Sequence, residues 1–212
     1  MYVVDRSVRF MRGFLASYAP SSIKKLFWDR DFSRGYWDFL DNTAGDCVYP
    51  HLERRAKGGS ILDLGCGPGN TANELAATAY SSYLGVDISE AALEKARRRT
   101  EANGRSDKNS FVQGDFLDYV PTQQFDLILF RESLYHVPMG KIKKVLTRYS
   151  KCLRDGGVLM VRLGTMVNGK SKRRPTAMIG IVEREFDVVE KTQYADSGAT
   201  VIVFRPTTQF TQ

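Results

Sequence analysis

The sequence predicts an α/β protein in which a mostly parallel, doubly wound sheet carries helices on both faces. Three observations predict this fold. From residue 61 onward, short apolar segments alternate with segments of amphipathic helical spacing. Residues 125–132 (FDLILFRE) are apolar at nearly every position, which is typical of a strand covered on both faces. Two extended segments, 185–194 and 200–206, are joined by a short turn and must pair antiparallel, so we expect a mixed sheet, parallel with an antiparallel edge.

The elements can be assigned in order along the chain. We expect a strand over 60–65, a helix over 70–80, a strand over 82–89, a helix over 90–102, strands over 109–116 and 125–132, a helix over 139–153, a strand over 157–163, a helix over 177–185 and then the two hairpin strands. The helix over 139–153 has an apolar face made of Ile142, Val145, Leu146, Tyr149 and Leu153. Asp155-Gly156-Gly157 is expected to end it.

Residues 1–56 precede the sheet and contain both tryptophans of the chain, Trp28 and Trp37. We expect two or three helices here, packed on the edge of the sheet where ligands bind. The predicted division is therefore an N-terminal helical cap over 1–56 and a sheet domain over 57–212. The first 18 residues alternate apolar residues with arginines and lack a cleavage site, which favours a helix over a signal peptide.

Composition argues against several classes of protein. Cys47, Cys66 and Cys152 are far apart and form no CxxC pair, so neither a disulfide framework nor a metal site is expected. We therefore expect a protein of the reducing cytoplasm. No run of 18 apolar residues is present, which argues against a membrane span. The net charge of +7 leaves an anionic partner open.

A glycine-rich segment, DLGCGPGN over 63–70, follows the first predicted strand and opens a helix. Gly65 and Gly67 allow the backbone to turn tightly and to approach a ligand closely, and Gly69 allows close packing where the helix begins. The spacing GxGxG differs from the dinucleotide fingerprint GxGxxG, and the phosphate-loop pattern is absent. The segment therefore predicts that a nucleoside-like group lies against bare backbone at the carboxyl end of the strand.

Acidic residues at the ends of the first three strands indicate which nucleoside this is. Asp87 follows the second strand and can accept hydrogen bonds from two ribose hydroxyls. Asp63 suits a cationic amino group, and Asp115 suits the exocyclic amine of adenine, with Phe116 covering the ring. Such carboxylates would repel a pyrophosphate but suit a ligand with an ammonium and a sulfonium group. Structural alternatives remain: Asp63 can brace the loop, Asp87 can cap the next helix beside Ser89, and Asp115 can be a turn residue.

Five motifs, ILDLGCGPGN, YLGVDIS, FVQGDF, FDLILFRESLYHVP and LRDGGVLMV, occur in one order over roughly residues 58–163. In this respect the chain resembles the class I (Rossmann-like) S-adenosylmethionine-dependent methyltransferases. The resemblance implies a seven-stranded sheet with S-adenosylmethionine as cofactor and S-adenosylhomocysteine as product. Carried over by position, the resemblance implies that the methionine part of the cofactor lies at Asp63, Gly65, Cys66, Gly67 and Gly69. It implies that the ribose lies at Asp87 and Ile88, and the adenine at Gly114, Asp115 and Phe116. Arg131 is then expected beside the methyl group. Cys66 is expected to be a small filler and not a nucleophile, because no cation lies close in sequence.

Methyl transfer to a hydroxyl usually needs a general base, whereas an amine need only arrive neutral. His136 and Glu132, in the segment after the fourth strand, are the candidate catalytic residues. Tyr135 and Arg131 are candidates for orienting the acceptor. For the lid over the acceptor, the candidate lining residues are Tyr18, Tyr36 and Trp37. The alternatives are that His136 starts the following helix and that the aromatic residues pack on the core.

The identity of the methyl acceptor is the feature that the sequence determines least. The motif (N/D)PP(Y/F) of nucleic-acid amino methyltransferases is absent, since this place reads RESL, so nucleic acid is disfavoured. The basic loop 168–175 (NGKSKRRP) can grip an anion or be a solvated loop. Because the insertion before the hairpin is short, we expect a small-molecule acceptor, with an anionic or sugar-linked one as an option, and a monomer or homodimer. The alternatives are a methyltransferase for RNA or protein, a non-catalytic protein that binds S-adenosylmethionine or S-adenosylhomocysteine, and an NAD-dependent oxidoreductase, which the glycine spacing disfavours.

Overall fold

The fold is taken from a computed structural model, which describes residues 17–38, 42–167 and 170–207. Its helices and strands are, in order, α2 (Ser21–Ser33), α3 (Tyr49–Ala56), β1 (Ser60–Leu64), α4 (Asn70–Glu74), β2 (Ser82–Asp87), α5 (Glu90–Ala102), β3 (Asn109–Gln113), β4 (Phe125–Arg131), α6 (Ile142–Ser150), β5 (Leu153–Gly164), β6 (Met166–Val167), β7 (Lys170–Ser171), α7 (Arg173–Glu185), β8 (Phe186–Tyr194) and β9 (Ala199–Pro206). Two short 3₁₀ turns, η2 (Leu134–His136) and η3 (Met139–Lys141), follow β4.

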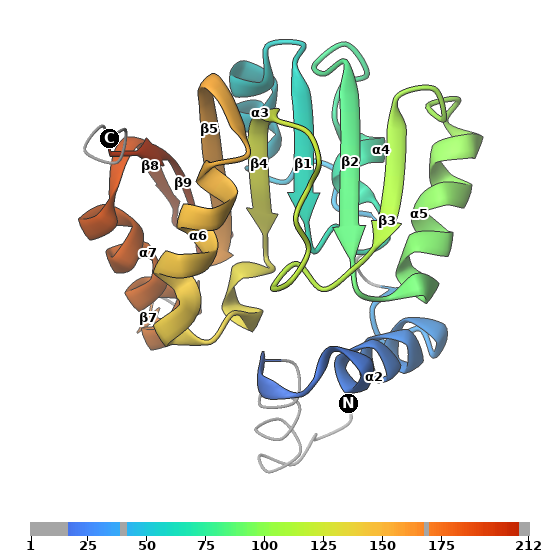
Figure 1. The fold of residues 1–212 in the computed structure, drawn as a ribbon, viewed down its shortest axis with the longest axis horizontal. Helices are drawn as coiled ribbons and strands as arrows, with labels where there is room; N and C mark the ends of the chain where they lie inside the picture. The colour runs from blue at the N-terminus through green and yellow to red at the C-terminus, as the bar shows by residue number, and fades with distance from the viewer. Residues whose placement is uncertain (1–16, 39–41, 168–169, 208–212) are drawn as a thin grey trace.

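The main sheet has seven strands in the order β3-β2-β1-β4-β5-β9-β8, so the predicted doubly wound, mixed sheet is confirmed (Figure 1). β1 to β5 are parallel, and β9 is antiparallel to both of its neighbours. The hairpin β8–β9 forms one edge of the sheet, as the sequence predicted, with β8 outermost and the final strand β9 next to β5. The burial of the hairpin explains this order, because the first six residues of β9 are all buried, whereas most of β8 is exposed or half-buried.

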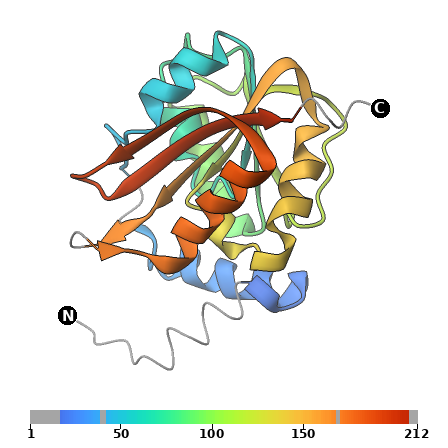
Figure 2. The same cartoon turned by 90° about the vertical axis from the view of Figure 1, so that its left-hand side faces the viewer.

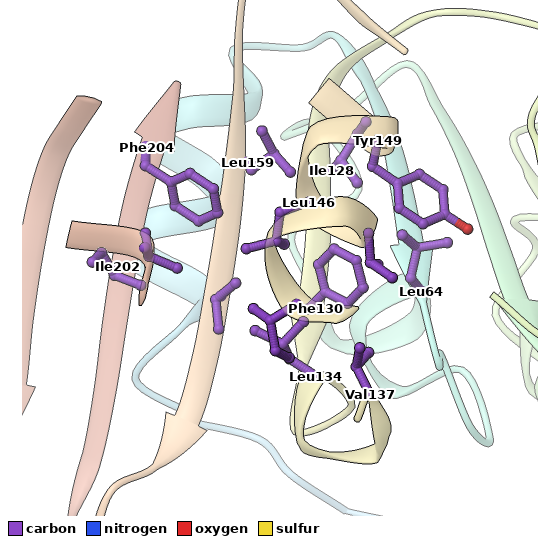
Figure 3. Close-up of a cluster of buried hydrophobic side chains, with 14 of the residues drawn as sticks. Leu64, Ile128, Phe130, Leu134, Val137, Leu146, Tyr149, Leu159, Ile202 and Phe204 are labelled. Carbon is purple, nitrogen blue, oxygen red and sulfur yellow. The ribbon is translucent and has the colours of Figure 1, made fainter. Parts of the chain in front are cut away.

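Two apolar layers hold the helices to the sheet. One layer lies under α6 and α7 and includes Leu64, Phe130, Leu146, Tyr149 and Phe204, several of which interdigitate in Figure 3. The other lies under α3 and α4 on the opposite face. Burial of both faces explains why β4 reads as a nearly continuous apolar run.

The helix α2 lies across the end of the sheet to which the strands β1, β2 and β3 point (Figures 1 and 2). Part of the predicted N-terminal cap is therefore over the carboxyl ends of the strands. The helix expected within residues 1–18 lies almost entirely outside the described residues. Among the described residues, no helix is both long enough and apolar enough to cross a membrane.

The helix predicted over 70–80 is shorter than expected, because α4 ends at Glu74 and Leu75 is extended. Side chains from later elements take the carbonyl groups that a longer helix would use. Arg105 donates to the Ala72 and Leu75 carbonyls at 2.9 and 2.7 Å, and the Tyr80 hydroxyl donates to the Ala72 carbonyl at 2.9 Å. Tertiary hydrogen bonds thus override the local preference for helix.

The helix predicted over 139–153 is also shorter. It begins as η3 and continues as α6 to Ser150, while Leu153 already belongs to β5, where it pairs with Phe125. The helix α7 is longer than predicted, since it starts at Arg173 and not at residue 177. The part of the basic loop that the structure describes forms β7 and the start of α7.

Candidate functional site

A cavity of about 430 Å³ opens at the carboxyl ends of the strands, beneath α2. Its walls come from α2 and the following segment, from the glycine-rich loop, and from the ends of β2 to β5. The lining residues are Lys24, Trp28, Phe32, Trp37, Thr43, Asp46, Gly65, Cys66, Gly67, Pro68, Asn70, Asp87, Ile88, Asp115, Phe116, Leu117, Arg131, Glu132, Ser133, Tyr135, His136 and Arg162. Most of the site residues expected from the sequence are thus brought together around one space.

The glycine-rich loop is tied to the end of β2. The amides of Gly65 and Cys66 both donate to the Val86 carbonyl, at 2.8 and 3.1 Å. Gly67 has a φ of 54°, and a Cβ added there would meet nothing closer than the Phe32 ring at 3.9 Å. Bare backbone therefore faces the cavity at Gly67. Gly69 does not line the cavity, and it packs against Ala96 of α5 instead.

Gly65 is expected to be intolerant of a side chain. Its φ is 80°, and a Cβ there would lie 2.5 Å from the Ser133 Cβ. Gly58 has a similar φ of 77° but nothing within 4 Å, which makes it a matched control for backbone strain alone. We expect Gly65→Ala to lower the free energy of unfolding by roughly 1–3 kcal/mol more than Gly58→Ala, measured by urea denaturation. Equal losses in the two variants would show that the contact with Ser133 carries no constraint.

Asp87 braces the glycine-rich loop from the end of β2. Its Oδ2 accepts from the Gly67 amide at 2.8 Å, and its Oδ1 accepts from the Ser89 amide at 2.9 Å. Burial raises the pKa of Asp87 to about 6. Ser89 caps α5 with its own hydroxyl, which accepts from the Ala92 amide at 3.2 Å. The carboxylate of Asp87 therefore lines the cavity without serving as the cap of α5, and Ile88 lines it as well.

Asp63 and Arg131 carry buried polar atoms without hydrogen-bond partners among the described residues. Oδ2 of Asp63 accepts from the Tyr83 hydroxyl at 2.7 Å, but Oδ1 has no partner, and burial raises the pKa of this carboxyl. Nε of Arg131 is likewise without a partner, whereas its Nη2 donates to Asp46 at 2.8 Å. Arg131 lines the cavity, whereas Asp63 does not.

Asp115, at the end of β3, is already bonded on both oxygens. Oδ1 accepts from the Leu117 amide at 2.9 Å, as in an Asx turn. Oδ2 accepts from the Lys24 ammonium and the Ser21 hydroxyl, each at 2.9 Å. Asp115 is thus both a turn residue and a wall of the cavity.

The neighbours of Asp115 differ in their positions. Phe116 lines the cavity and packs edge-on against Phe130. Gly114 does not line it, and its amide donates to the Asp87 carbonyl at 2.8 Å. Cys66 lines the cavity. Burial raises the pKa of its thiol well above the usual value, and the negative charges of Asp87 and Asp63 raise it further. This thiol has the environment of a filler and not of a nucleophile.

Glu132 and Tyr135 form a polar group after β4. Glu132 has a left-handed φ of 55°, which is rare for a residue with a side chain. Its Oε1 accepts from the Gly164 amide at 2.6 Å and from the guanidinium of Arg162. Burial and the neighbouring Glu132 raise the pKa of Tyr135 well above its usual value, so its hydroxyl stays protonated. The strained backbone of Glu132 is a feature that often marks functional sites.

His136 is the last residue of η2 and contacts α2. Its ring packs edge-on against Trp28 and Tyr135, with centroids 5.1 and 4.6 Å apart. Burial lowers the pKa of His136 to about 4, and the charges of Arg174 and Lys24 act in the same direction. The imidazole is therefore neutral near pH 7 and can accept a hydrogen bond from a ligand.

The aromatic residues of the cap are divided between the cavity and other places. Trp37 lines the cavity, as do Trp28 and Phe32, which the sequence analysis did not name as lining residues. Tyr18 lines a second, neighbouring cavity of about 460 Å³, and Tyr36 is 55% exposed and lines neither. The cavity is thus roofed by three aromatic rings from one segment.

Three charged residues of the cavity were missed by the sequence analysis. Asp46 bridges two arginines, with Oδ2 2.8 Å from Arg131 Nη2 and Oδ1 3.3 Å from Arg162 Nε. Arg162 could have been predicted from the sequence, since it is a charged residue near the carboxyl end of an otherwise apolar strand. Asp46 and Lys24 could not, because each reaches the site from a segment far away in the sequence.

Comparisons with known proteins agree with this architecture. Residues 61–157 match the family model described as a methyltransferase domain. The chain is 31% identical over 120 residues to the sterol 24-C-methyltransferase erg6 of Aspergillus fumigatus, which covers 56% of this chain and 31% of that protein. It is 32% identical over 158 residues to the carboxy-S-adenosyl-L-methionine synthase of Desulfotalea psychrophila, covering 73% of this chain and 63% of that protein. This chain therefore spans less than two thirds of the length of either relative.

A solved structure supports the fold. The crystal structure of the N-methyltransferase NodS from Bradyrhizobium japonicum, in complex with S-adenosyl-L-homocysteine, superposes with a TM-score of 0.65 at 21% identity, over 84% of this chain and 98% of that one. Sheet order and cavity position together define a Rossmann-like α/β protein with its ligand space at the carboxyl ends of the strands. The match over 61–157 adds that this part of the chain is similar to methyltransferase domains, so S-adenosylmethionine is the cofactor to compare with the cavity.

The residues of the cavity fit this cofactor. Arg131 is in the cavity wall, and its Nε is a buried donor without a hydrogen-bond partner, which suits the carboxylate of the cofactor. The Oδ1 of Asp63 is also without a partner, but Asp63 does not line the cavity. The open backbone at Gly67 leaves room for close approach. Four carboxylates (Asp46, Asp87, Asp115 and Glu132) and three cations (Lys24, Arg131 and Arg162) line the cavity, so its wall suits a ligand with a net positive charge.

Proposed function

We propose that this protein transfers a methyl group from S-adenosylmethionine to an O or N atom of a small-molecule acceptor. The observation that carries the proposal is the continuity of the cavity. It runs from Asp87 and Asp115 to Glu132, Tyr135 and His136 without an intervening wall. The cofactor and a second small molecule would therefore share one space under the aromatic lid.

On this proposal the carboxylates at the strand ends hold the cofactor. Asp87 accepts hydrogen bonds from the ribose hydroxyls, and Asp115 with Phe116 receives the adenine. Arg131 binds the carboxylate of the amino-acid end, and Asp63, which does not itself line the cavity, attracts its ammonium. When bound, the cofactor supplies a methyl group that is already activated by the positive sulfur.

Glu132, Tyr135 and His136 are proposed to serve the acceptor. Trp28 and Trp37 exclude water above them, and Tyr135 orients the acceptor with its protonated hydroxyl. Neutral His136 is the candidate to accept a proton from a hydroxyl acceptor, and Glu132 is the second candidate. Since Lys24, Arg131 and Arg162 each pair with a carboxylate of the protein, we favour an uncharged acceptor over an anionic one. A small molecule is also consistent with the sterol in the name of one relative.

His136 is expected to stay neutral over the whole physiological range, because burial lowers its pKa to about 4. The chain has two histidines, so NMR of the imidazole protons resolves both, and His136→Asn identifies the signal. We expect no titration of His136 above about pH 5. In the unfolded chain the pKa of this histidine is about 6.5, so the unfolded state binds a proton between pH 6.5 and 4 that the folded state does not. The free energy of unfolding therefore falls as the pH is lowered through that range. A His136 midpoint of 6 or higher would contradict the expectation.

The function is tested first by calorimetric titration of the wild-type protein with S-adenosylmethionine, S-adenosylhomocysteine and NAD. Binding of the two sulfur ligands without NAD supports the proposal, and it is followed by a screen of hydroxyl and amine acceptors with methyl-labelled cofactor. Binding of NAD alone, or of none of the three, would refute the proposal. Cofactor binding without transfer to any acceptor would leave a non-catalytic binding protein, and transfer to RNA or protein alone would reject the small-molecule acceptor.

A further inference from the structure

The lid helix α2 is inverted relative to an ordinary surface helix. Lys24, Asp31 and Phe32 are buried, whereas Ile23 and Leu26 are 45 and 66% exposed. Lysine is almost never fully buried unless it is paired. The burial of Lys24 therefore indicates a specific partner, and the orientation of α2 is not explained by burial of its aliphatic residues.

The partner of Lys24 is Asp115. The Nζ–Oδ2 distance is 2.9 Å, and the two side chains are only 7 and 8% exposed. Ser21, one helical turn earlier, donates to the same oxygen at 2.9 Å. The carboxylate that is proposed to receive the adenine amine is thus already occupied by donors from the lid.

A second contact fixes the other half of α2. Oδ1 of Asp29 accepts from the Ser89 hydroxyl at 2.8 Å and from the Ala91 amide at 3.2 Å, at the start of α5. The lid is therefore anchored beside the ends of β2 and β3, the strands that end in the proposed ribose and adenine carboxylates. Of the two anchors, only the one at Asp115 uses a carboxylate that lines the cavity.

An alternative partner for Lys24 is close by. Lys24 and Asp115 line both the main cavity and the second cavity, and Asp118 lines the second. The Ser21 hydroxyl is 3.4 Å from Asp118 Oδ2, so this carboxylate is within reach of the same helical turn. Asp118 is exposed, so an ammonium that moves to it exchanges a buried position for one in contact with water.

We propose that Lys24 is a latch that holds the lid closed through Asp115, and that the adenine amine of the cofactor displaces it toward Asp118. The inference rests on the proposed function, because it takes adenine to be the group that competes for Asp115. Both the ammonium and the amine are N–H donors, and both need the same carboxylate oxygen. Breaking the ion pair then gates the access of the cofactor, and Lys24 and Asp118 act as positioning residues of the lid.

The test is stopped-flow binding of S-adenosylhomocysteine, followed by the fluorescence of Trp28 and Trp37, the chain's two tryptophans, which both line the cavity. We expect Lys24→Met to speed association and dissociation at least about tenfold, since a hydrogen bond between charged groups is lost from the closed lid. Lys24→Arg should restore the wild-type rates. Lys25→Met is the matched control, because Lys25 is 41% exposed and pairs with Oδ2 of Asp29, which leaves the bonds of Asp29 Oδ1 to α5 in place. Asp118→Asn should weaken binding about two- to fivefold.

Association that is unchanged or slower in Lys24→Met would overturn the latch, and unchanged affinity in Asp118→Asn would overturn the transfer to that carboxylate. A wild-type protein that does not bind S-adenosylhomocysteine refutes the proposed function and not the latch. The latch is then judged by hydrogen–deuterium exchange of the ligand-free protein. Faster exchange over residues 21–33 in Lys24→Met than in Lys25→Met, with the sheet unchanged, supports it, and equal exchange refutes it.

Discussion

Replacing Asp87 with alanine should weaken the binding of S-adenosylhomocysteine at least about a hundredfold. Two ribose hydroxyls would lose hydrogen bonds to a charged oxygen, each worth about 1.5–3 kcal/mol. The loss is larger than the ligand contacts alone suggest, because Asp87 also holds the Gly67 amide at 2.8 Å. Without it, the glycine-rich loop is free to move away from the position in which it meets the ligand.

Calorimetric titration measures this loss, and Asp126→Ala provides the control. Asp126 also accepts a hydrogen bond from a backbone amide, that of Ser60 at 2.7 Å. This bond is at the beginning of β1, at the opposite end of the strand from the cavity. The control variant should lose stability and keep its affinity for the ligand. If Asp87→Ala bound S-adenosylhomocysteine as tightly as wild type, Asp87 would be a brace of the loop and not a ligand residue.

The pH dependence of binding gives an independent signature of Asp87. Burial raises its pKa to about 6, and the ribose hydroxyls need the ionised carboxylate as acceptor. Affinity should therefore fall below pH 6, by up to about tenfold per pH unit, and the residual affinity of Asp87→Ala should lack this fall. The contribution of Asp87 to the free energy of unfolding has the opposite pH dependence. Because the pKa in the folded state is above the unfolded value, the stabilising contribution of protonated Asp87 is complete below about pH 3.9 and is lost as the pH rises through 6.

The fold was predictable wherever one local pattern decides the outcome. The apolar run of β4 predicted a strand buried on both faces, and the spacing in α5 predicted a helix whose bounds, Glu90–Ala102, match those expected. The prediction was wrong where distant groups compete with a local preference. α4 ends early because Arg105 takes the carbonyls near its end, and Leu153 leaves the expected helix to pair with Phe125.

The candidate site was predictable for residues that directly follow a strand. Gly65, Asp87 and Asp115 meet at one edge because the carboxyl ends of parallel strands do so. Lys24 reaches the same cavity through a contact with Asp115 that spans 91 positions, and Asp46 contacts Arg162 across 116. No local sequence pattern predicts such contacts, since they depend on how the N-terminal segment packs against the folded sheet.

Replacing Asp46 with alanine should have the second large effect, a loss of about 3–5 kcal/mol in the free energy of unfolding. Arg131 and Arg162 are partners in the register of β4 and β5, so two like charges stand opposite each other at the end of the sheet. Asp46 lies between them and is 9% exposed. Although burial alone would raise its pKa, the charges of Arg131 and Arg162 lower it, so the carboxylate is ionised and compensates both.

A double-mutant cycle separates this charge compensation from ordinary packing. Arg162→Met removes one of the two cations and should leave Asp46 adequately paired with Arg131. In that background, Asp46→Ala should cost at least about 1 kcal/mol less than in wild type, measured by urea denaturation at pH 7. The difference should shrink in acid, because the lowered pKa places the stabilising contribution of Asp46 above about pH 4, and it is lost as the carboxylate is protonated. Additive losses at both pH values would mean that Asp46 holds its loop by packing alone, and that the two arginines tolerate each other through solvent.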